Sequence, residues 1–321
     1  MPGRRTPIRA GLGRAGVAAV SVPSPIAAPT PANWASIAVL GLVWGGTFMV
    51  VALALRGYGP VTVAAARTGL GALAVAALAL ALRRPRPQLD GERILFLAAL
   101  GLLTAAAPFL LLAWGIVHVP SAFAGLSMAV LPLFVLPLAH LFVPGDRLTA
   151  RKAGGFALGL AGAAILLGPG ALHAPAGDLA ALGRLACLAA TACYALGSIL
   201  TRRCPPMDPL WMAALILAAG SLVTGPAMLA LEGMPPPAAA IPTAALVVLG
   251  LVPTAFAAVL RVVVIRSAGP SFMTLVNYQV PLWAMLAGWA VLDEALPPRL
   301  FAALALILAG LAVSQGGRRR R

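Results

Sequence analysis

Acidic residues are scarce in this chain, and charge of either sign is limited. Only 8 of the 321 residues are Asp or Glu, and charged residues make up 10% of the total. A soluble domain carries about 25% charged residues, because its surface must be hydrated. The shortage excludes an ordinary water-soluble fold and leaves lipid as the solvent for much of the surface.

Cysteine and histidine are also rare, with three of each. Cys187 and Cys193 lie inside one apolar run, and neither a CxxC nor a His-x-x-x-His spacing occurs. The sequence therefore predicts no disulfide framework and no metal site. No Ser/His/Asp set and no cluster of His with acids is visible, so we expect no catalytic residues and no cofactor, and we predict that the chain is not an enzyme.

Hydrophobic residues dominate instead, at 61% of the chain, with a mean hydropathy of +0.98. Residues 1–33, rich in Arg, Pro, Gly and Ala, are predicted to form a disordered basic tail, and residues 315–321 a second basic tail. Between them lie ten apolar runs of spanning length, at 34–53, 60–82, 94–117, 121–143, 153–168, 179–201, 209–231, 241–265, 270–292 and 297–314. Because these runs do not alternate, a membrane barrel is disfavoured. The predicted fold class is all-α, a polytopic membrane protein of ten transmembrane helices.

The formal charge of +15 comes from basic residues that flank the apolar runs and form no stripe with interleaved aromatics. We therefore expect a lipid bilayer and a small-molecule substrate as partners, and no nucleic acid. If the amino terminus is cytoplasmic and each run crosses once, only Arg56 and Arg299 of the 23 basic residues lie outside, and Arg67, Arg184 and Arg261 lie within runs. This asymmetry predicts that both termini are cytoplasmic.

The two halves of the chain resemble each other. Residues 101–132 align without gaps on residues 250–281, a shift of 149 that superposes Gly101 on Gly250 and Pro132 on Pro281. Five helices per half is an odd number, so the second repeat (178–314) would insert upside down relative to the first (34–168). The alternative is a chance match between two segments rich in Ala, Leu and Gly. An inverted repeat is typical of carriers that work by alternating access.

Several loose motifs are specific in combination. They are Trp44-Gly45-Gly46-Thr47-Phe48, Ala66-Arg67-Thr68, Pro132 with Gly145-Asp146-Arg147-Leu148-Thr149, Leu260-Arg261, Gly269-Pro270, Tyr278, Pro281, Gly288 and Asp293-Glu294. Together they resemble the EamA-like drug/metabolite transporter superfamily, bacterial exporters with two five-helix repeats. The chain departs from that pattern at Asp146, where the family usually has Glu, and in its long amino-terminal tail. The resemblance implies efflux of a metabolite, an amino-acid-like compound or a drug across the bacterial inner membrane.

The polar and aromatic residues within the runs are the candidates for substrate binding. They are Trp44, Thr47, Arg67, Trp114, Tyr194, Arg261, Asn277, Tyr278 and Gln279, with Pro132 and Pro281 as candidate helix breaks or gating points. Arg67 lies on the order of 10 Å deep at 1.5 Å per residue, and either faces the bundle interior or snorkels to the interface. Arg261 is included because it falls on the family pattern, although snorkelling is the favoured interpretation there.

No Asp or Glu lies well inside any run. The cavity is therefore expected to be neutral to positive, which favours anionic, zwitterionic or neutral solutes over lipophilic cations. Proton coupling, for which His140 is a candidate, and facilitated diffusion or exchange both remain open, as do a monomer and a homodimer. The alternative functions are a membrane-embedded enzyme or lipid-handling protein, and a scaffold or receptor that transports nothing.

Overall fold

The computed structural model describes residues 29–142, 150–167, 179–201, 204–205, 207–268, 273 and 275–315, and every regular element there is a helix. In chain order the elements are α1 (Pro31–Ala54), α2 (Pro60–Ala81), α3 (Gly91–Gly101), η1 (Leu102–Ala106), α4 (Ala107–His118), α5 (Ser121–Ser127), η2 (Met128–Val130), α6 (Leu131–Phe142), α7 (Ala150–Leu167), α8 (Leu179–Thr201), α9 (Pro209–Leu231), α10 (Ala240–Leu249), η3 (Gly250–Phe256), α11 (Ala257–Ala268), α13 (Val276–Leu292) and α14 (Pro298–Gln315). The all-α prediction is confirmed over these residues.

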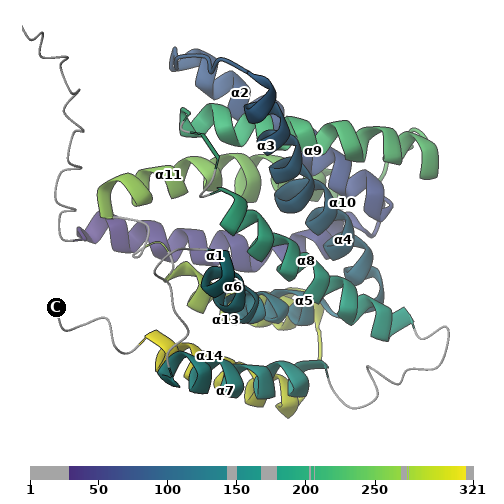
Figure 1. The fold of residues 1–321 in the computed structure, drawn as a ribbon. Helices are drawn as coiled ribbons and strands as arrows, with labels where there is room; N and C mark the ends of the chain where they lie inside the picture. The colour runs from purple at the N-terminus through teal and green to yellow at the C-terminus, as the bar shows by residue number, and fades with distance from the viewer. Residues whose placement is uncertain are drawn as a thin grey trace, which may run out of the picture.

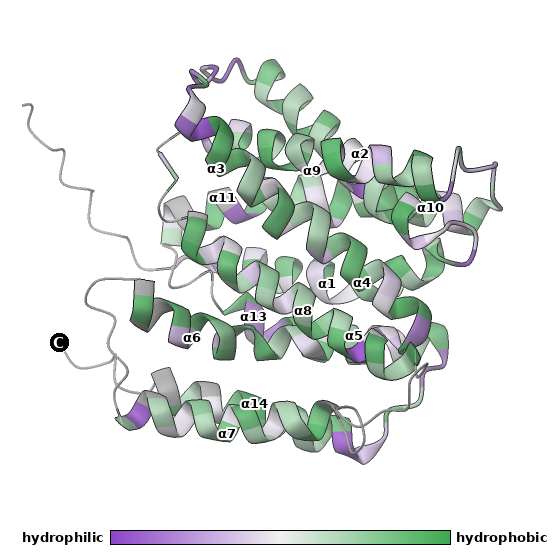
Figure 2. Cartoon of the chain, turned by 45° about the vertical axis from the view of Figure 1, so that its right-hand side comes forward, coloured by the Kyte–Doolittle hydropathy of each residue, from purple (hydrophilic) through white to green (hydrophobic). Residues whose placement is uncertain are grey.

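Six helical segments are long and apolar enough to cross a membrane: Pro31–Ala54, Pro60–Ala81, Gly91–His118, Leu179–Thr201, Pro209–Leu231 and Ala240–Arg261. Four shorter apolar helices accompany them: Ser121–Val135, Ala153–Leu166, Gln279–Leu292 and Pro298–Gly310. Figure 2 shows hydrophobic residues along the helices and hydrophilic residues gathered mainly at helix ends and in loops. The chain is a multi-pass membrane protein, because only lipid can cover apolar surface on this scale.

The helices form layers in which members of the two halves lie side by side. In Figure 1, α2 and α9 lie together at one side of the bundle and α7 and α14 at the other, with α1, α8 and α13 between them. The buried hydroxyls of Thr68 on α2 and Thr224 on α9 lie 2.9 Å apart and share a hydrogen bond. Bonds of this kind stabilise helix pairs in lipid, where apolar burial contributes little.

The packing partners are exchanged between the two halves. Helix α1 packs along α13 and against α10 and α11, whereas α8 packs along α6 and against α4. A shift of 149 residues carries α1 approximately onto α8, α6 onto α13 and α4 onto α11, so the contacts of α1 with α13 and α11 correspond to those of α8 with α6 and α4.

The third spanning segment of each half contains a wide, π-helical turn at the equivalent place. Shifting η1 by 149 residues places it within η3. A Cβ atom added at Gly71 would lie 2.6 Å from the Thr254 methyl of η3, and one added at Gly220 would lie 2.9 Å from Ala105 Cβ of η1. The same shift relates both members of these two contacts. Glycine is required in both copies because it allows the neighbouring helix to approach this closely.

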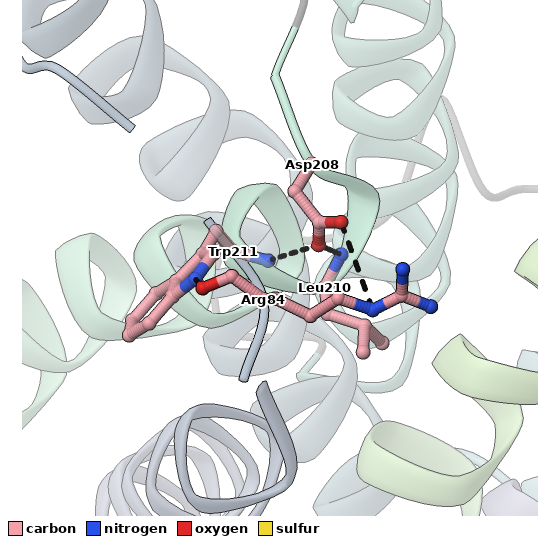
Figure 3. Close-up of polar contacts among 4 residues, drawn as sticks. All are labelled: Arg84, Asp208, Leu210 and Trp211. Atoms are coloured by element: carbon pink, nitrogen blue, oxygen red, sulfur yellow. Dashed lines mark hydrogen bonds and ion pairs between the residues drawn. The ribbon is translucent and has the colours of Figure 1, made fainter. Parts of the chain in front are cut away.

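The start of α1 and the end of α14 lie at the same end of the bundle (Figure 1), and we call it the basic end because Arg83, Arg84, Arg86 and Arg93 lie there. Here Asp208 caps α9, accepting hydrogen bonds from the backbone N–H groups of Leu210 and Trp211 at 2.9 and 3.4 Å. The Arg84 Nε lies 3.9 Å from the Asp208 carboxylate, and the Trp211 indole donates to the Arg84 carbonyl (Figure 3). The end of α2 and the start of α9 are thereby joined.

At the opposite, acidic end, two glutamates of the second half cap helices of the first half. The Glu232 carboxylate accepts hydrogen bonds from the N–H groups of Val61 and Thr62 at the start of α2, at 2.9 and 2.8 Å. The Glu294 carboxylate accepts from Ser121 and Ala122 at the start of α5, at 2.7 and 2.8 Å. A carboxylate at a helix start satisfies free N–H groups and opposes the positive end of the helix dipole.

Candidate functional site

Arg67 lies in the first half of α2 and is buried, with 8% of its surface exposed. Its guanidinium carbon sits 3.8 Å from the centroid of the Phe109 ring on α4, and its Nε donates to the Thr254 hydroxyl on η3 at 3.1 Å. In the part of the chain that the structure describes, no Asp or Glu forms an ion pair with it. Cation–π contact compensates part of the lost hydration but leaves the positive charge in place.

The Thr254 acceptor is held by its own helix. Pro253 has no backbone N–H, and the Thr254 hydroxyl donates to the Leu249 carbonyl at 2.8 Å. The Pro253 carbonyl in turn accepts a hydrogen bond from the Trp44 indole of α1 at 3.2 Å. The wide turn η3 of the second half therefore contacts α1 and α2 of the first half through two consecutive residues.

Tyr194 of α8 completes the cluster. Its hydroxyl lies close enough to the Arg67 guanidinium for the two groups to interact electrostatically. The ring is half-buried and packs against both hydrophobic cores of the bundle. Three sequence candidates, Trp44, Arg67 and Tyr194, are thus brought to one place by α1, α2 and α8.

In the described chain, the Arg67 side chain donates one hydrogen bond, through Nε, and its terminal nitrogens have no partner there. The fully enclosed polar atoms that lack a hydrogen-bond partner are Arg84 Nε and Ser121 Oγ, so the Arg67 terminal nitrogens are not fully enclosed and keep an accessible side. A planar guanidinium whose two terminal nitrogens are free along one edge fits a carboxylate or phosphate in bidentate geometry. The structure describes no group of His, Cys, Asp or Glu that could hold a metal ion. The chemistry on offer is therefore anion binding.

Three other sequence candidates lie apart from this cluster. The buried Thr47 hydroxyl donates to the Val43 carbonyl of its own helix at 2.8 Å. Trp114 contacts the His118 ring edge-on, with centroids 4.6 Å apart. Arg261 lies on α11 with an exposed side chain.

The candidates of the ninth run lie on α13 or at its start. The side chains of Asn277 and Gln279 are half-buried, and Gln279 packs against Gly41 of α1. The side chain of Tyr278 lies outside the described part of the chain. Pro281 is buried inside α13, and Pro132 lies in the first turn of α6, directly after the short helix η2. The side chain of His140 and residues 143–149, which include Asp146, also fall outside the described residues.

Phe109 and Thr254 are the members of the site that the sequence did not single out. Both lie close to Arg67 only because of long-range packing, with Thr254 187 residues away in the chain. A polar residue directly after a proline within an apolar run, as in Pro253-Thr254, is the signal that could have indicated Thr254.

A hollow of about 560 Å³ lies at the acidic end and shares no residue with the Arg67 cluster. It is lined by Trp289, Asp293, Glu294, Ala295, Leu296 and Phe301. Trp289 and Phe301 are more than half exposed, as interfacial aromatics in membrane proteins are. Because the hollow shares no residue with the Arg67 cluster, it is not part of that site.

Comparison with known proteins gives the chain its family. The model of the EamA-like transporter family matches twice, at residues 33–168 and 181–315. A protein of Streptantibioticus cattleyicolor (strain ATCC 35852) named "Probable terminal-alkyne amino-acid exporter" is 30% identical over 282 residues, covering 87% of this chain and 92% of that protein. A solved structure titled "Crystal structure of protein" has a TM-score of 0.63 at 21% identity, covering 90% of this chain and 99% of that one, and so shares the fold.

These matches confirm the predicted resemblance and the expectation of a transporter rather than an enzyme. The family description and the apolar helices of the structure agree on a membrane carrier. The chain belongs to the EamA-like transporter family.

Proposed function

We propose that this protein exports small amino-acid-like carboxylates from the cytoplasm, with Arg67 binding the carboxylate of the substrate. The single observation that carries the proposal is the buried guanidinium, stacked on Phe109 and fixed at Nε by Thr254, with no ion-pair partner in the described chain. A buried charge in a spanning segment is costly, and its retention without an internal partner favours a role in binding. A substrate anion would supply the missing counter-charge.

The relative named as an amino-acid exporter supports the substrate class. An amino acid presents a carboxylate to Arg67, and the aromatic rings of Trp44, Phe109 and Tyr194 offer apolar surface for its side chain. The described spans bury Arg67 but no Asp or Glu. This charge balance favours zwitterions and anions over lipophilic cations.

The proposed architecture is ten transmembrane helices in two inverted repeats, 34–168 and 178–314, between basic tails at 1–33 and 315–321. The double family match, the exchanged packing partners and the paired wide turns η1 and η3 support it. If the basic end is cytoplasmic, both termini would lie on the cytoplasmic side of the bacterial inner membrane. Two halves of opposite polarity could then expose Arg67 alternately to either side.

Transport into liposomes tests the substrate assignment. Wild-type protein is expected to move propargylglycine, a terminal-alkyne amino acid, and Arg67→Ala is expected to reduce the initial rate about tenfold or more, because a charge-assisted hydrogen bond to substrate is lost. Arg299→Ala, which removes an exposed arginine at the acidic end, is the matched control and should leave the rate unchanged. An unchanged rate in the folded Arg67→Ala protein would exclude Arg67 from the site.

Cysteine labelling tests the inverted topology. Arg147→Cys and Arg299→Cys are made separately in a protein whose three native cysteines are replaced by serine. A membrane-impermeant maleimide applied to intact cells should label residue 299 and not residue 147. Labelling of both from the same side would contradict the inverted repeat.

A further inference from the structure

We propose that Pro253 and Thr254 are positioning residues that orient the Arg67 guanidinium for a substrate carboxylate, an inference that rests on the proposed function. Neither residue needs to touch the substrate. They would act through a chain of hydrogen bonds that begins at a backbone carbonyl of the second half and ends at an arginine of the first half.

The chain of hydrogen bonds starts in the wide turn. Proline at position 253 lacks the N–H that an α-helix would direct at the Leu249 carbonyl four residues earlier, and in the π-helical turn this carbonyl pairs with the residue five positions on, Thr254. The Thr254 hydroxyl also donates to that carbonyl, at 2.8 Å. Elsewhere in the bundle, Thr47 of α1 and Thr224 of α9 bond the carbonyl four residues earlier, as threonine does in a regular α-helix. The wide turn thus gives Thr254 a different direction from an ordinary helical threonine.

This bond fixes which way the Thr254 hydroxyl faces. A hydroxyl has one proton and two lone pairs, and the proton is used on the Leu249 carbonyl. The lone pairs are therefore free to accept, and Arg67 Nε donates to them at 3.1 Å. Two linked hydrogen bonds that run in the same direction polarise one another, which strengthens the bond from Arg67 Nε to the Thr254 hydroxyl.

The other branch of Thr254 is fixed as well. Its methyl carbon lies where a side chain at Gly71 would be, one helical turn after Arg67 on α2. A β-branched side chain with both branches in contact has a single rotamer available. Glycine at position 71 therefore allows η3 to approach α2 closely enough for the hydroxyl to reach Arg67.

The consequence is a defined orientation for the substrate-binding edge. Thr254 holds Nε on one edge of the guanidinium plane and Phe109 covers one face of it. The remaining edge carries the two terminal nitrogens, and a carboxylate binds there with two parallel hydrogen bonds only if the plane is held still. Because Phe109 belongs to the first half and Thr254 to the second, a relative movement of the halves would change this hold and release the carboxylate.

Binding to the purified full-length protein in detergent tests the proposal, with propargylglycine and its primary carboxamide as the two probes. Thr254→Val keeps the shape of the side chain and removes the acceptor, so the Kd for propargylglycine should rise about tenfold. The Kd for the carboxamide, which has no carboxylate, should change less than about twofold, as small surface effects do. Thr254→Ser restores the hydroxyl and should bring the Kd for propargylglycine back near the wild-type value.

Pro253→Ala separates positioning from structure. It returns an N–H to position 253, which favours an ordinary α-helical turn over the wide turn and so redirects the Thr254 hydroxyl, and an intermediate loss of propargylglycine affinity is expected. In the double variant Pro253→Ala/Thr254→Val the loss should equal that of Thr254→Val alone, because Pro253 acts only through Thr254.

The possible outcomes separate this inference from the proposed function. Wild-type protein that binds neither probe would contradict the substrate class, and this inference with it. Wild-type protein that binds propargylglycine, together with a Thr254→Val protein that binds it equally well, would overturn the positioning role alone. Equal weakening of both probes by Thr254→Val, or additive losses in the double variant, would show that Thr254 acts on the structure generally, and would also overturn it.

Discussion

The wide turns η1 and η3 occupy matching places in the two halves, yet only one of them holds a charged group. Thr254 of η3 bonds Arg67, whereas Ala105 at the equivalent place of η1 only packs against Gly220. The residue that corresponds to Arg67 in the second half is Ile216. The backbone geometry and the close glycine contact are kept in both copies, while the polar residues are present in one. A symmetric backbone arrangement thus carries an asymmetric set of polar contacts, and under the proposed function this set is the substrate site.

The largest effect is expected from giving the second half its own arginine. Ile216→Arg would place a cation within α9. The residues equivalent to Thr254 and Phe109 around it are Ala105 and Ala258, and neither can stabilise its charge. We expect a loss of about 3 kcal/mol of stability, the cost of an arginine at the middle of a spanning helix. Thermal unfolding in detergent measures it. The triple variant with Ala105→Thr and Ala258→Phe should recover part of the loss, and no recovery would mean that the halves are not equivalent here.

The paired glycines should separate packing from function. Gly71→Ala and Gly220→Ala each place a Cβ within 3 Å of a neighbouring atom, so both should destabilise the protein by about 1–3 kcal/mol. Only Gly71→Ala displaces Thr254, so only that variant should also weaken propargylglycine binding. Equal binding losses in the two variants would remove the distinction between the halves.

The acidic end offers a second asymmetric feature, since Glu232 and Glu294 of the second half cap α2 and α5 of the first. Replacing either with Gln removes the charge and should cost about 1 kcal/mol in thermal unfolding measurements. Asp293→Asn is the control, because Asp293 is exposed, Asn also adopts its left-handed backbone (φ 53°), and in the described chain its side chain caps no helix. A loss in the control as large as that of Glu294→Gln would contradict the capping role.

The smallest effect belongs to the basic end. Arg84→Met removes an ion pair 3.9 Å long in which the arginine side chain is 39% exposed, so stability should fall by less than about 0.5 kcal/mol. The Trp211 hydrogen bond to the Arg84 backbone carbonyl survives this change (Figure 3). Asp208→Ala, which removes the α9 cap, should cost more, about 1 kcal/mol. The reverse order in urea or thermal unfolding would show that the ion pair matters more than the cap.

The sequence predicted the helices more completely than the site. Apolar runs bounded by Pro, Gly and Arg placed most helix ends within a few residues of those observed, because lipid leaves a spanning backbone few alternatives. Arg67 was recognisable because a cation within an apolar run is exceptional. Phe109 and Thr254 were not recognisable, because stacking and hydrogen bonding between helices depend on how the helices pack. The sequence of one helix does not show how it packs. The cap that Glu294 places on α5 likewise depends on how the two halves pack.

The wide turns also affect how well the chain tolerates the deletion of single residues. A π-helical turn holds more backbone per turn than an α-helix, so the loss of one residue within it can be absorbed by tightening the turn while the helix on either side keeps its face. In a regular stretch the same loss rotates everything downstream by about 100°. Single deletions in this protein should therefore be least harmful within 102–106, where no substrate-holding residue would be lost.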